Sequence, residues 1–289
     1  MSQPAPASSI LEFLTYPNPN VKHVKPKSKK LTTSPNYYFP TQVLPWDEFD
    51  VHLLETIYDG NLIQALHQQG HVLPTYPRLS PLTDLEIRTE GDTRSLIRKW
   101  NETIVTAALE PIQQDFYPVI WSRGDNPKEN EQFDVPPRRP GSRSQPPRQA
   151  SNKSRKRKKQ SLSRLRPDSG SSAWCLPNPS SDPVTTAPAD RRERFPKEYK
   201  VSTKWKSKAV LDGNLLNEEG EWEDGQHANN LAMPINQAFT YCVANRCRYG
   251  SILTCEEAFI FRIKPRDKGS GLYPISCGSS RLADSSRRM

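Results

Sequence analysis

The chain has 289 residues, of which 34% are hydrophobic and 28 are prolines, and its formal net charge at neutral pH is +9. The hydrophobic share lies below the roughly 45–50% of ordinary domains and proline is about twice its usual ~5%, so we expect one modest core with long disordered segments. Apolar runs are too short for a membrane span of about 18 residues, and the N-terminus lacks a signal-peptide pattern. We therefore expect an intracellular protein without membrane contact.

The first 122 residues divide into a polar segment and a helical part. Residues 1–45, rich in Pro, Ser and Lys, are predicted to be disordered, although the short SILEFL can dock as a helical turn. Residues 46–122 are predicted to be the helical part of the core, because apolar residues recur at helical spacing over 46–70 and from Thr93 to Phe116. Asp92 is expected to cap the second helix, since its carboxylate can accept a first-turn N–H. The apolar stripe of that helix comprises Ile97, Trp100, Ile104, Val105 and Ala108.

Residues 123–166 are predicted to be a disordered basic linker that interrupts the core. Twelve Lys and Arg and no acidic residue lie between Arg138 and Arg166, so the rest of the chain carries about −3 (9 − 12). The basic tract comprises Arg155, Lys156, Arg157, Lys158 and Lys159. Five consecutive cations are typical of a nuclear signal bound by an import receptor and of contacts with nucleic-acid phosphates. A solvated charge run that nothing recognises is the alternative.

The core resumes over residues 167–264. Strands are expected at 171–176, 198–205, 251–254 and 258–263, and a helix at 234–247 that Pro234 opens and Gly250 ends. This order predicts an α+β fold in which a small mixed β-sheet is flanked by the helices at 93–115 and 234–247, with extensive disordered segments around it. Residues 265–289 are predicted to be a disordered tail.

The five cysteines do not indicate a disulfide framework. Their number is odd and no C-x-x-C occurs, which also argues against a zinc ribbon. We expect reduced thiols, as in intracellular proteins. Cys242 and Cys247 are five residues apart and do not share a helix face, so core positions suit them better than metal binding.

Two acidic residues and a lysine could serve phosphodiester chemistry. Such cleavage needs a divalent cation, and Mg²⁺ prefers oxygen ligands, usually one or two carboxylates with waters and phosphate oxygens. Asp168 precedes one predicted strand and Glu198 lies in the next; these are the candidate metal ligands. Lys200 is two residues further on and therefore shares the strand face of Glu198, where it can orient a water and offset negative charge. An ordinary solvated strand remains the alternative, because E-x-K triplets also arise by chance.

The order of these motifs resembles the PD-(D/E)XK nuclease-like fold. More closely, the chain is similar to an uncharacterised fungal protein family whose domain is also found alongside fungal-type protein kinase domains. The resemblance rests on RSLIRKWNETIVTAAL, RPD at 166–168, YKVSTKWKS and NQAFTYCVANRCRYGSILTCEEAFIFRI, and it covers about residues 85–265. It implies that Asp168, Glu198 and Lys200 are catalytic positions and that Gln237 is a polar position on the following helix. Glu90, before the first long helix, is a weaker match.

Two functions are compatible with this pattern. The first is a non-catalytic or degenerate nuclease-like module of a fungal nuclear protein, which binds nucleic acid or a protein partner and needs no cofactor. The second is an active Mg²⁺-dependent phosphodiesterase on DNA or RNA, so enzymatic activity is left open. A long proline-rich loop between Asp168 and Glu198 and an atypical C-terminal tail, as of a truncated chain, favour the first. The distance between the two carboxylates is the observation expected to discriminate between them.

The basic tract predicts nuclear localisation, with the cytoplasm as the alternative. Replacing Arg155–Lys159 with alanine in a fluorescent fusion should abolish nuclear accumulation, because an import receptor recognises the clustered cations. Fluorescence microscopy of the intact and substituted fusions measures the effect. Unchanged nuclear accumulation of the substituted fusion would contradict a targeting role.

Overall fold

The computed structural model describes residues 10–24, 31, 34, 37–49, 75–110, 119–122, 167–168, 170–173, 195–264 and 275–281. The helices are α1 (Ile10–Thr15), α4 (Glu90–Ile97), the π-helical segment η2 (Arg98–Glu102), α5 (Thr103–Leu109), α6 (Lys208–Leu211), the 3₁₀ turn η5 (Gln226–Ala228) and α7 (Met233–Ala244). The strands are β1 (Lys22–His23), β2 (Val43–Pro45), β3 (Glu86–Ile87), β4 (Val119–Ser122), β5 (Gly170–Ala173), β6 (Lys197–Tyr199), β7 (Tyr249–Leu253), β8 (Glu257–Ile263) and β9 (Ile275–Arg281).

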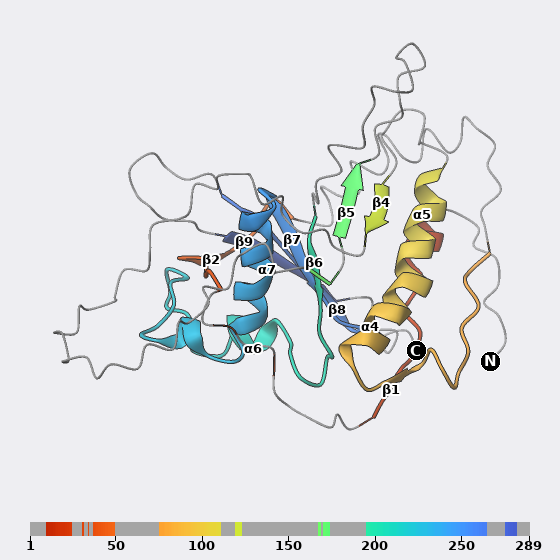
Figure 1. Cartoon of the computed structure of the whole chain (residues 1–289), viewed down its shortest axis with the longest axis horizontal. Helices are drawn as coiled ribbons and strands as arrows, with labels where there is room; N and C mark the ends of the chain where they lie inside the picture. The colour runs from red at the N-terminus through yellow and green to blue at the C-terminus, as the bar shows by residue number, and fades with distance from the viewer. Residues whose placement is uncertain are drawn as a thin grey trace, which may run out of the picture.

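The main sheet is mixed and has the strand order β2-β9-β8-β7-β6 (Figure 1). The pairs β7–β8 and β8–β9 are antiparallel, whereas β2–β9 and β6–β7 are parallel. Helix α7 packs on β6 and β7, and α4 contacts β6. The predicted α+β class, with a mixed sheet flanked by helices, is confirmed.

The prediction that the strand near 171–176 joins the main sheet is wrong. This strand, β5, instead pairs antiparallel with β4 in a separate two-stranded sheet. Its sequence, Gly-Ser-Ser-Ala, offers little apolar surface for a buried position. The strand predicted at 198–205 is also shorter, because the chain turns after Lys200. The hairpin predicted from 251–254 and 258–263 is confirmed as β7–β8.

Two segments that were expected to be disordered contain regular structure. Within residues 1–45 lie α1, β1 and β2, and within residues 265–289 lies β9. Strand β9 pairs with β8 on one side and with β2 on the other, so segments more than 200 residues apart complete the same sheet. Val43 and Ile275, which are paired in register, are both buried. Long-range pairing therefore supplies the order that the local sequence does not indicate.

Helix α4 begins earlier than predicted. Its N-cap is Thr89, whose hydroxyl accepts from the Asp92 amide at 3.2 Å, while the Asp92 carboxylate accepts from the Thr89 amide at 2.8 Å. Asp92 is thus not the N-cap but the third helical residue of a capping box, which satisfies two backbone donors. As a result Glu90 occupies the first turn of the helix. In the predicted stripe Val105 is half-buried and the other four residues are buried.

Helix α7 has Pro234 in its first turn, as predicted, but it ends at Ala244 rather than at 247. Asn245 caps it, and Arg246 follows with a positive φ of 53°. Gly250 does not end the helix and lies in β7. A Cβ there would come within 2.5 Å of Cys242 Sγ, so glycine lets the strand approach the helix closely.

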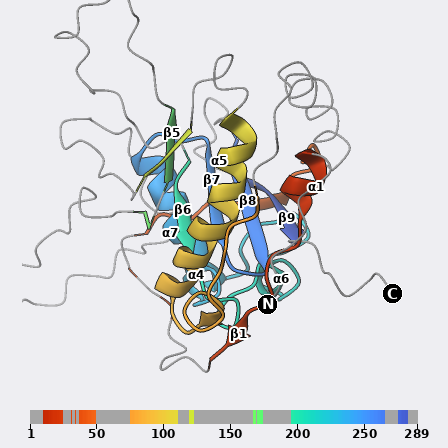
Figure 2. The same cartoon turned by 90° about the vertical axis from the view of Figure 1, so that its right-hand side faces the viewer.

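The described residues form two hydrophobic clusters. One lies between α7 and the main sheet and includes Trp205, Phe259 and Phe261. The other surrounds Trp100 and joins α1, α4 and α5, which Figure 2 shows on one side of the sheet. Trp205 belongs to the first cluster and Val201, four residues earlier, to the second. The segment after β6 therefore joins both halves of the core.

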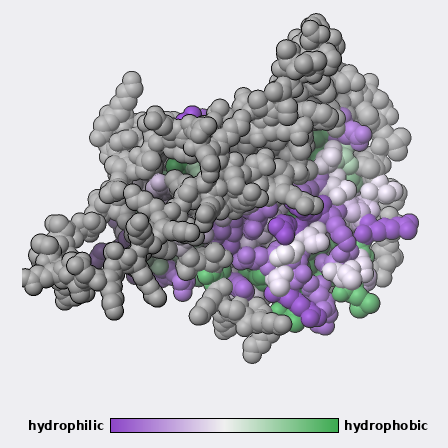
Figure 3. All heavy atoms as spheres, in the orientation of Figure 1, coloured by the Kyte–Doolittle hydropathy of each residue, from purple (hydrophilic) through white to green (hydrophobic). Residues whose placement is uncertain are grey.

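Among the described residues, the exposed large hydrophobic side chains are Tyr16, Leu82, Leu211 and Tyr249. On the face in Figure 3 the coloured atoms are mostly hydrophilic, with hydrophobic atoms in small separate groups. Among the described helices, none is both long and apolar enough to cross a bilayer. No disulfide joins the four described cysteines, which are all buried. Most of the helical stretch predicted at 46–70, the linker 123–166 and its basic tract lie outside the described residues.

The position of β9 predicts that Ile275 stabilises the core. Ile275 is fully buried, so Ile275→Ala should lower the free energy of unfolding by roughly 2–5 kcal/mol, through lost apolar contact and a cavity. Urea unfolding followed by circular dichroism measures this. Leu82→Ala is the control, because Leu82 is 83% exposed and should change stability by less than about 0.5 kcal/mol. Equal effects of the two substitutions would contradict the buried position of β9.

Candidate active site

Three carboxylates from separate segments meet beside β6. Glu90 is the first residue of α4, Asp168 precedes β5 and Glu198 is the central residue of β6. One oxygen of each lies within 4.8 Å of the others. The Tyr199 amide donates to Asp168 Oδ2 at 3.3 Å, which ties Asp168 to the strand. The structure therefore brings together the two predicted metal ligands, and it adds Glu90.

The lysine of the E-x-K motif lies among these carboxylates. Lys200 Nζ is 2.5 Å from Glu198 Oε1 and 3.4 Å from Glu90 Oε1. Both Glu198 and Lys200 are buried, whereas Glu90 is partly exposed. The Lys200 amide donates to Leu253 O at 2.9 Å, so the backbone pairing of β6 with β7 continues as far as Lys200. Glu198 and Lys200 are two residues apart in this extended segment and therefore lie on the same face, as predicted.

Gln237 approaches the same lysine from α7. Its Oε1 accepts from Lys200 Nζ at 3.4 Å, and its Nε2 donates to Tyr241 Oη at 2.8 Å. The side-chain amide thus links the helix to the lysine and fixes the direction of the ammonium group. All four candidate catalytic residues, Asp168, Glu198, Lys200 and Gln237, belong to one cluster.

The electrostatics of the cluster favour a cation. With all groups ionised, three carboxylates and one ammonium leave a charge of −2 (−3 + 1). Burial above all, together with the charges of Asp168 and Glu90, raises the pKa of the Glu198 carboxyl to about 8, against the opposing effect of Lys200. Burial alone would lower the pKa of Lys200, but the three carboxylates outweigh it and hold that pKa above its usual value. The lysine therefore keeps its charge, and Glu198 holds a proton more readily than an ordinary glutamate does, a proton that a bound divalent cation would displace.

The donor set fits a magnesium ion. Mg²⁺ takes carboxylate oxygens together with waters and phosphate oxygens. Glu198 Oε2 is buried and makes no hydrogen bond to a described residue, although a buried carboxylate oxygen is normally satisfied. Asp168, Glu198 and Glu90 are the residues that would hold the ion.

The sequence pattern placed Tyr241 in a stripe of α7 that could form a polar wall beside the acidic site, but it missed Tyr37 and the pair of Lys197 with Glu102. Tyr37 and Tyr241 lie close enough that burial first, and then the Glu198 charge, raise their pKa values, to about 12 for Tyr37. Their hydroxyls remain proton donors at neutral pH. On the other face of β6, Lys197 Nζ is 2.6 Å from Glu102 Oε1 in a second buried ion pair. The sequence KEYK could have indicated this pair, because it places charged residues at neighbouring positions and therefore on both faces of the strand.

Comparison of the chain with models of known protein families and with curated proteins finds no match.

The raised pKa of Glu198 predicts a pH-dependent cost to folding. A folded-state pKa of about 8 against 4.5 in the unfolded chain means that the carboxyl's stabilising contribution is complete below pH 4.5 and is lost as pH rises through about 8. Glu198→Gln mimics the protonated form, so its Tm should match that of the intact protein at acid pH and exceed it increasingly toward pH 8. Thermal unfolding in the presence of a chelator measures this. A constant Tm difference across that range would contradict the burial of an ionisable carboxyl here.

Proposed function

We propose that the chain is a Mg²⁺-dependent phosphodiesterase module of the PD-(D/E)XK type that acts on nucleic acid. The observation that supports it most is the approach of Asp168 to Glu198, with oxygens within 4.8 Å of each other. A loop that held these residues apart would have favoured a non-catalytic module. The carboxylates of Asp168 and Glu198 instead lie close to Lys200, which suits metal-dependent cleavage of a phosphodiester.

The roles of the residues follow from their exposure and contacts. A bound Mg²⁺ would offset phosphate charge and lower the pKa of an attacking water. Asp168 and Glu90 are partly exposed, so a phosphate would approach the ion from their side. Glu198 is buried and would bind the ion from the protein interior. Lys200, held by Glu198 and Gln237, would orient the water and stabilise negative charge that develops on the phosphate oxygens.

The basic tract supports nucleic acid as the substrate class. The acidic cluster itself repels phosphates, so binding affinity must come from cations elsewhere in the chain. Five cations in Arg155–Lys159 and twelve between Arg138 and Arg166 supply such contacts, which are independent of base sequence. The same tract supports a nuclear location, where both DNA and RNA are available.

A non-catalytic module that binds nucleic acid or a protein partner is the second candidate. The complete burial of Lys200 supports it, because buried ion pairs also occur as structural networks that perturb pKa values without catalysis. In that case the lysine itself neutralises part of the cluster, and the chain needs no metal ion.

Cleavage assays distinguish the two candidates. Purified full-length protein should cleave DNA or RNA, single- or double-stranded, only with Mg²⁺ or Mn²⁺, and Glu198→Gln, which keeps the side-chain volume, should abolish cleavage. Lys200→Ala should lower turnover by roughly 100-fold or more and change nucleic-acid binding much less, since its contribution is made in the transition state.

The controls are Glu219→Ala and Lys208→Ala, which remove exposed residues of the same types and should leave turnover unchanged. Circular dichroism checks that each variant is folded. Equal background cleavage by the intact protein and by Glu198→Gln would contradict the proposal of an enzyme. If both proteins then still bind nucleic acid in a salt-dependent way, the result would support the non-catalytic module.

A further inference from the structure

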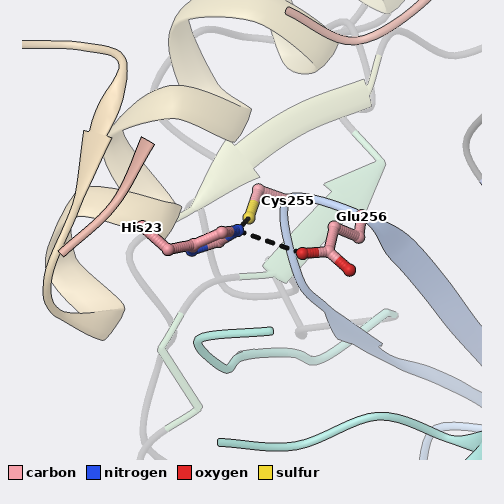
Figure 4. A group of neighbouring side chains, drawn as sticks. All are labelled: His23, Cys255 and Glu256. Carbon is pink, nitrogen blue, oxygen red and sulfur yellow. Dashed lines mark hydrogen bonds and ion pairs between the residues drawn. The ribbon is translucent and has the colours of Figure 1, made fainter. Parts of the chain in front are cut away.

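A second cluster of metal-binding side chains lies where β1 meets the turn between β7 and β8 (Figure 4). His23 belongs to β1, and Cys255 and Glu256 are adjacent in the turn. His23 Nε2 lies 3.0 Å from Glu256 Oε1 and 3.9 Å from Cys255 Sγ, and the three donor atoms are all within 4.8 Å of one another. Figure 4 shows the three side chains pointing toward a common centre.

We propose that His23, Cys255 and Glu256 bind a borderline-soft divalent cation of the zinc type. Imidazole, thiolate and carboxylate are the three protein ligand types that zinc uses, whereas Mg²⁺ takes oxygen ligands. The donor set therefore separates this cluster chemically from the carboxylates around Lys200. Binding forms a metal–sulfur bond and releases the thiol proton of Cys255 to solvent.

The distances suit a tetrahedral ion. Zinc bonds of about 2.0–2.3 Å place neighbouring tetrahedral donors roughly 3.3–3.6 Å apart. The observed separations from His23 Nε2, 3.0 Å to Glu256 Oε1 and 3.9 Å to Cys255 Sγ, lie on either side of that range. Shifts of a few tenths of an ångström would complete the geometry.

Backbone hydrogen bonds hold the donors on both sides. The amides of Lys22 and Val24, which flank His23, donate to Leu85 O and Ile87 O at 2.8 and 3.0 Å. In the β7–β8 turn, Thr254 Oγ1 accepts from the amides of Glu256 and Glu257 at 3.1 and 3.0 Å. Two ordered segments from distant parts of the sequence therefore present the three donors, so little rearrangement is needed for binding.

Two further polar groups complete the surroundings of the donors. Ser202 Oγ is 3.2 Å from His23 Nε2 and 3.3 Å from Cys255 Sγ, and it also hydrogen-bonds Glu256. Its hydroxyl can be the fourth donor or can hold the three ligands around the ion. Lys206 Nζ pairs with Glu256 Oε2 at 2.8 Å, which leaves Oε1 directed at the cation position.

Exposure of the donors indicates an ion that exchanges with solvent. The Cys255 residue is 5% exposed, whereas the side chains of His23 and Glu256 are 23% and 41% exposed. Burial raises the pKa of the Cys255 thiol, which argues against a reactive nucleophilic cysteine. A cation here would crosslink β1 to the β7–β8 turn and so stabilise the attachment of the N-terminal segment.

Cobalt and zinc titrations test the site on the full-length protein after chelation. Co²⁺ should give the thiolate-to-cobalt charge-transfer absorption, Zn²⁺ should displace it, and Zn²⁺ should raise Tm. Cys255→Ala should abolish that band. His23→Ala and Glu256→Gln should weaken Co²⁺ binding by roughly 10-fold or more, since even loss of an outer-shell partner costs this much.

The controls separate this site from other thiols and from the acidic cluster. Cys247→Ala removes another buried thiol and should keep the band. Glu198→Gln should also keep it, so failure of this proposal and failure of Mg²⁺-dependent cleavage are distinguishable. Because Glu256 is partly exposed, Glu256→Gln serves as the test even where Cys255→Ala does not fold. Absence of the band in the intact protein, or unchanged Co²⁺ affinity in Glu256→Gln, would overturn the proposal.

Discussion

The burial of the Lys200 ammonium group is the constraint on which the arrangement around β6 depends. Moving such a cation from water into the interior costs several kcal/mol unless opposite charges and hydrogen bonds surround it. Glu90 from α4, Glu198 from β6 and Gln237 from α7 all contact it. These three elements must therefore keep their relative positions in the folded state, because a displacement of one leaves a buried charge without its partners.

The position of β6 explains why it can carry so many charges. It is the last strand of the main sheet among the described residues, and the two hydrophobic clusters lie on either side of the segment that continues it. Lys197 on one face pairs with Glu102 of the π-helical segment, and Lys200 on the other pairs with Glu198. Charged side chains on an edge strand also oppose pairing with other chains. The charged residues of β6 thus form the polar site and also disfavour pairing of this edge strand with another chain.

Sequence patterns predicted the elements whose signal is local. The 3.6-residue periodicity of α7 and the alternation in β8 gave the right types of element, and E-x-K placed Glu198 and Lys200 on one face. The patterns failed for β2, which has three residues and ends in Pro, and for β9, which is rich in Gly and Ser, since such strands acquire their place from distant partners. His23 was missed for the same reason: its proximity to Cys255 arises from the fold, in a segment whose composition indicates only disorder.

Strand β6 and the segment after it connect the acidic cluster with the proposed zinc-type site. Glu198, Lys200 and Ser202 alternate along this stretch; the first two belong to the acidic cluster, and Ser202 contacts His23 and Cys255. Donor chemistry would keep the two sites separate, because oxygen ligands alone suit Mg²⁺ and a thiolate with an imidazole suits zinc. A zinc-type ion would fix β1 and the β7–β8 turn beside Ser202, two residues from Lys200. Occupancy of that site would thereby limit the motion of the strand that carries the proposed catalytic lysine.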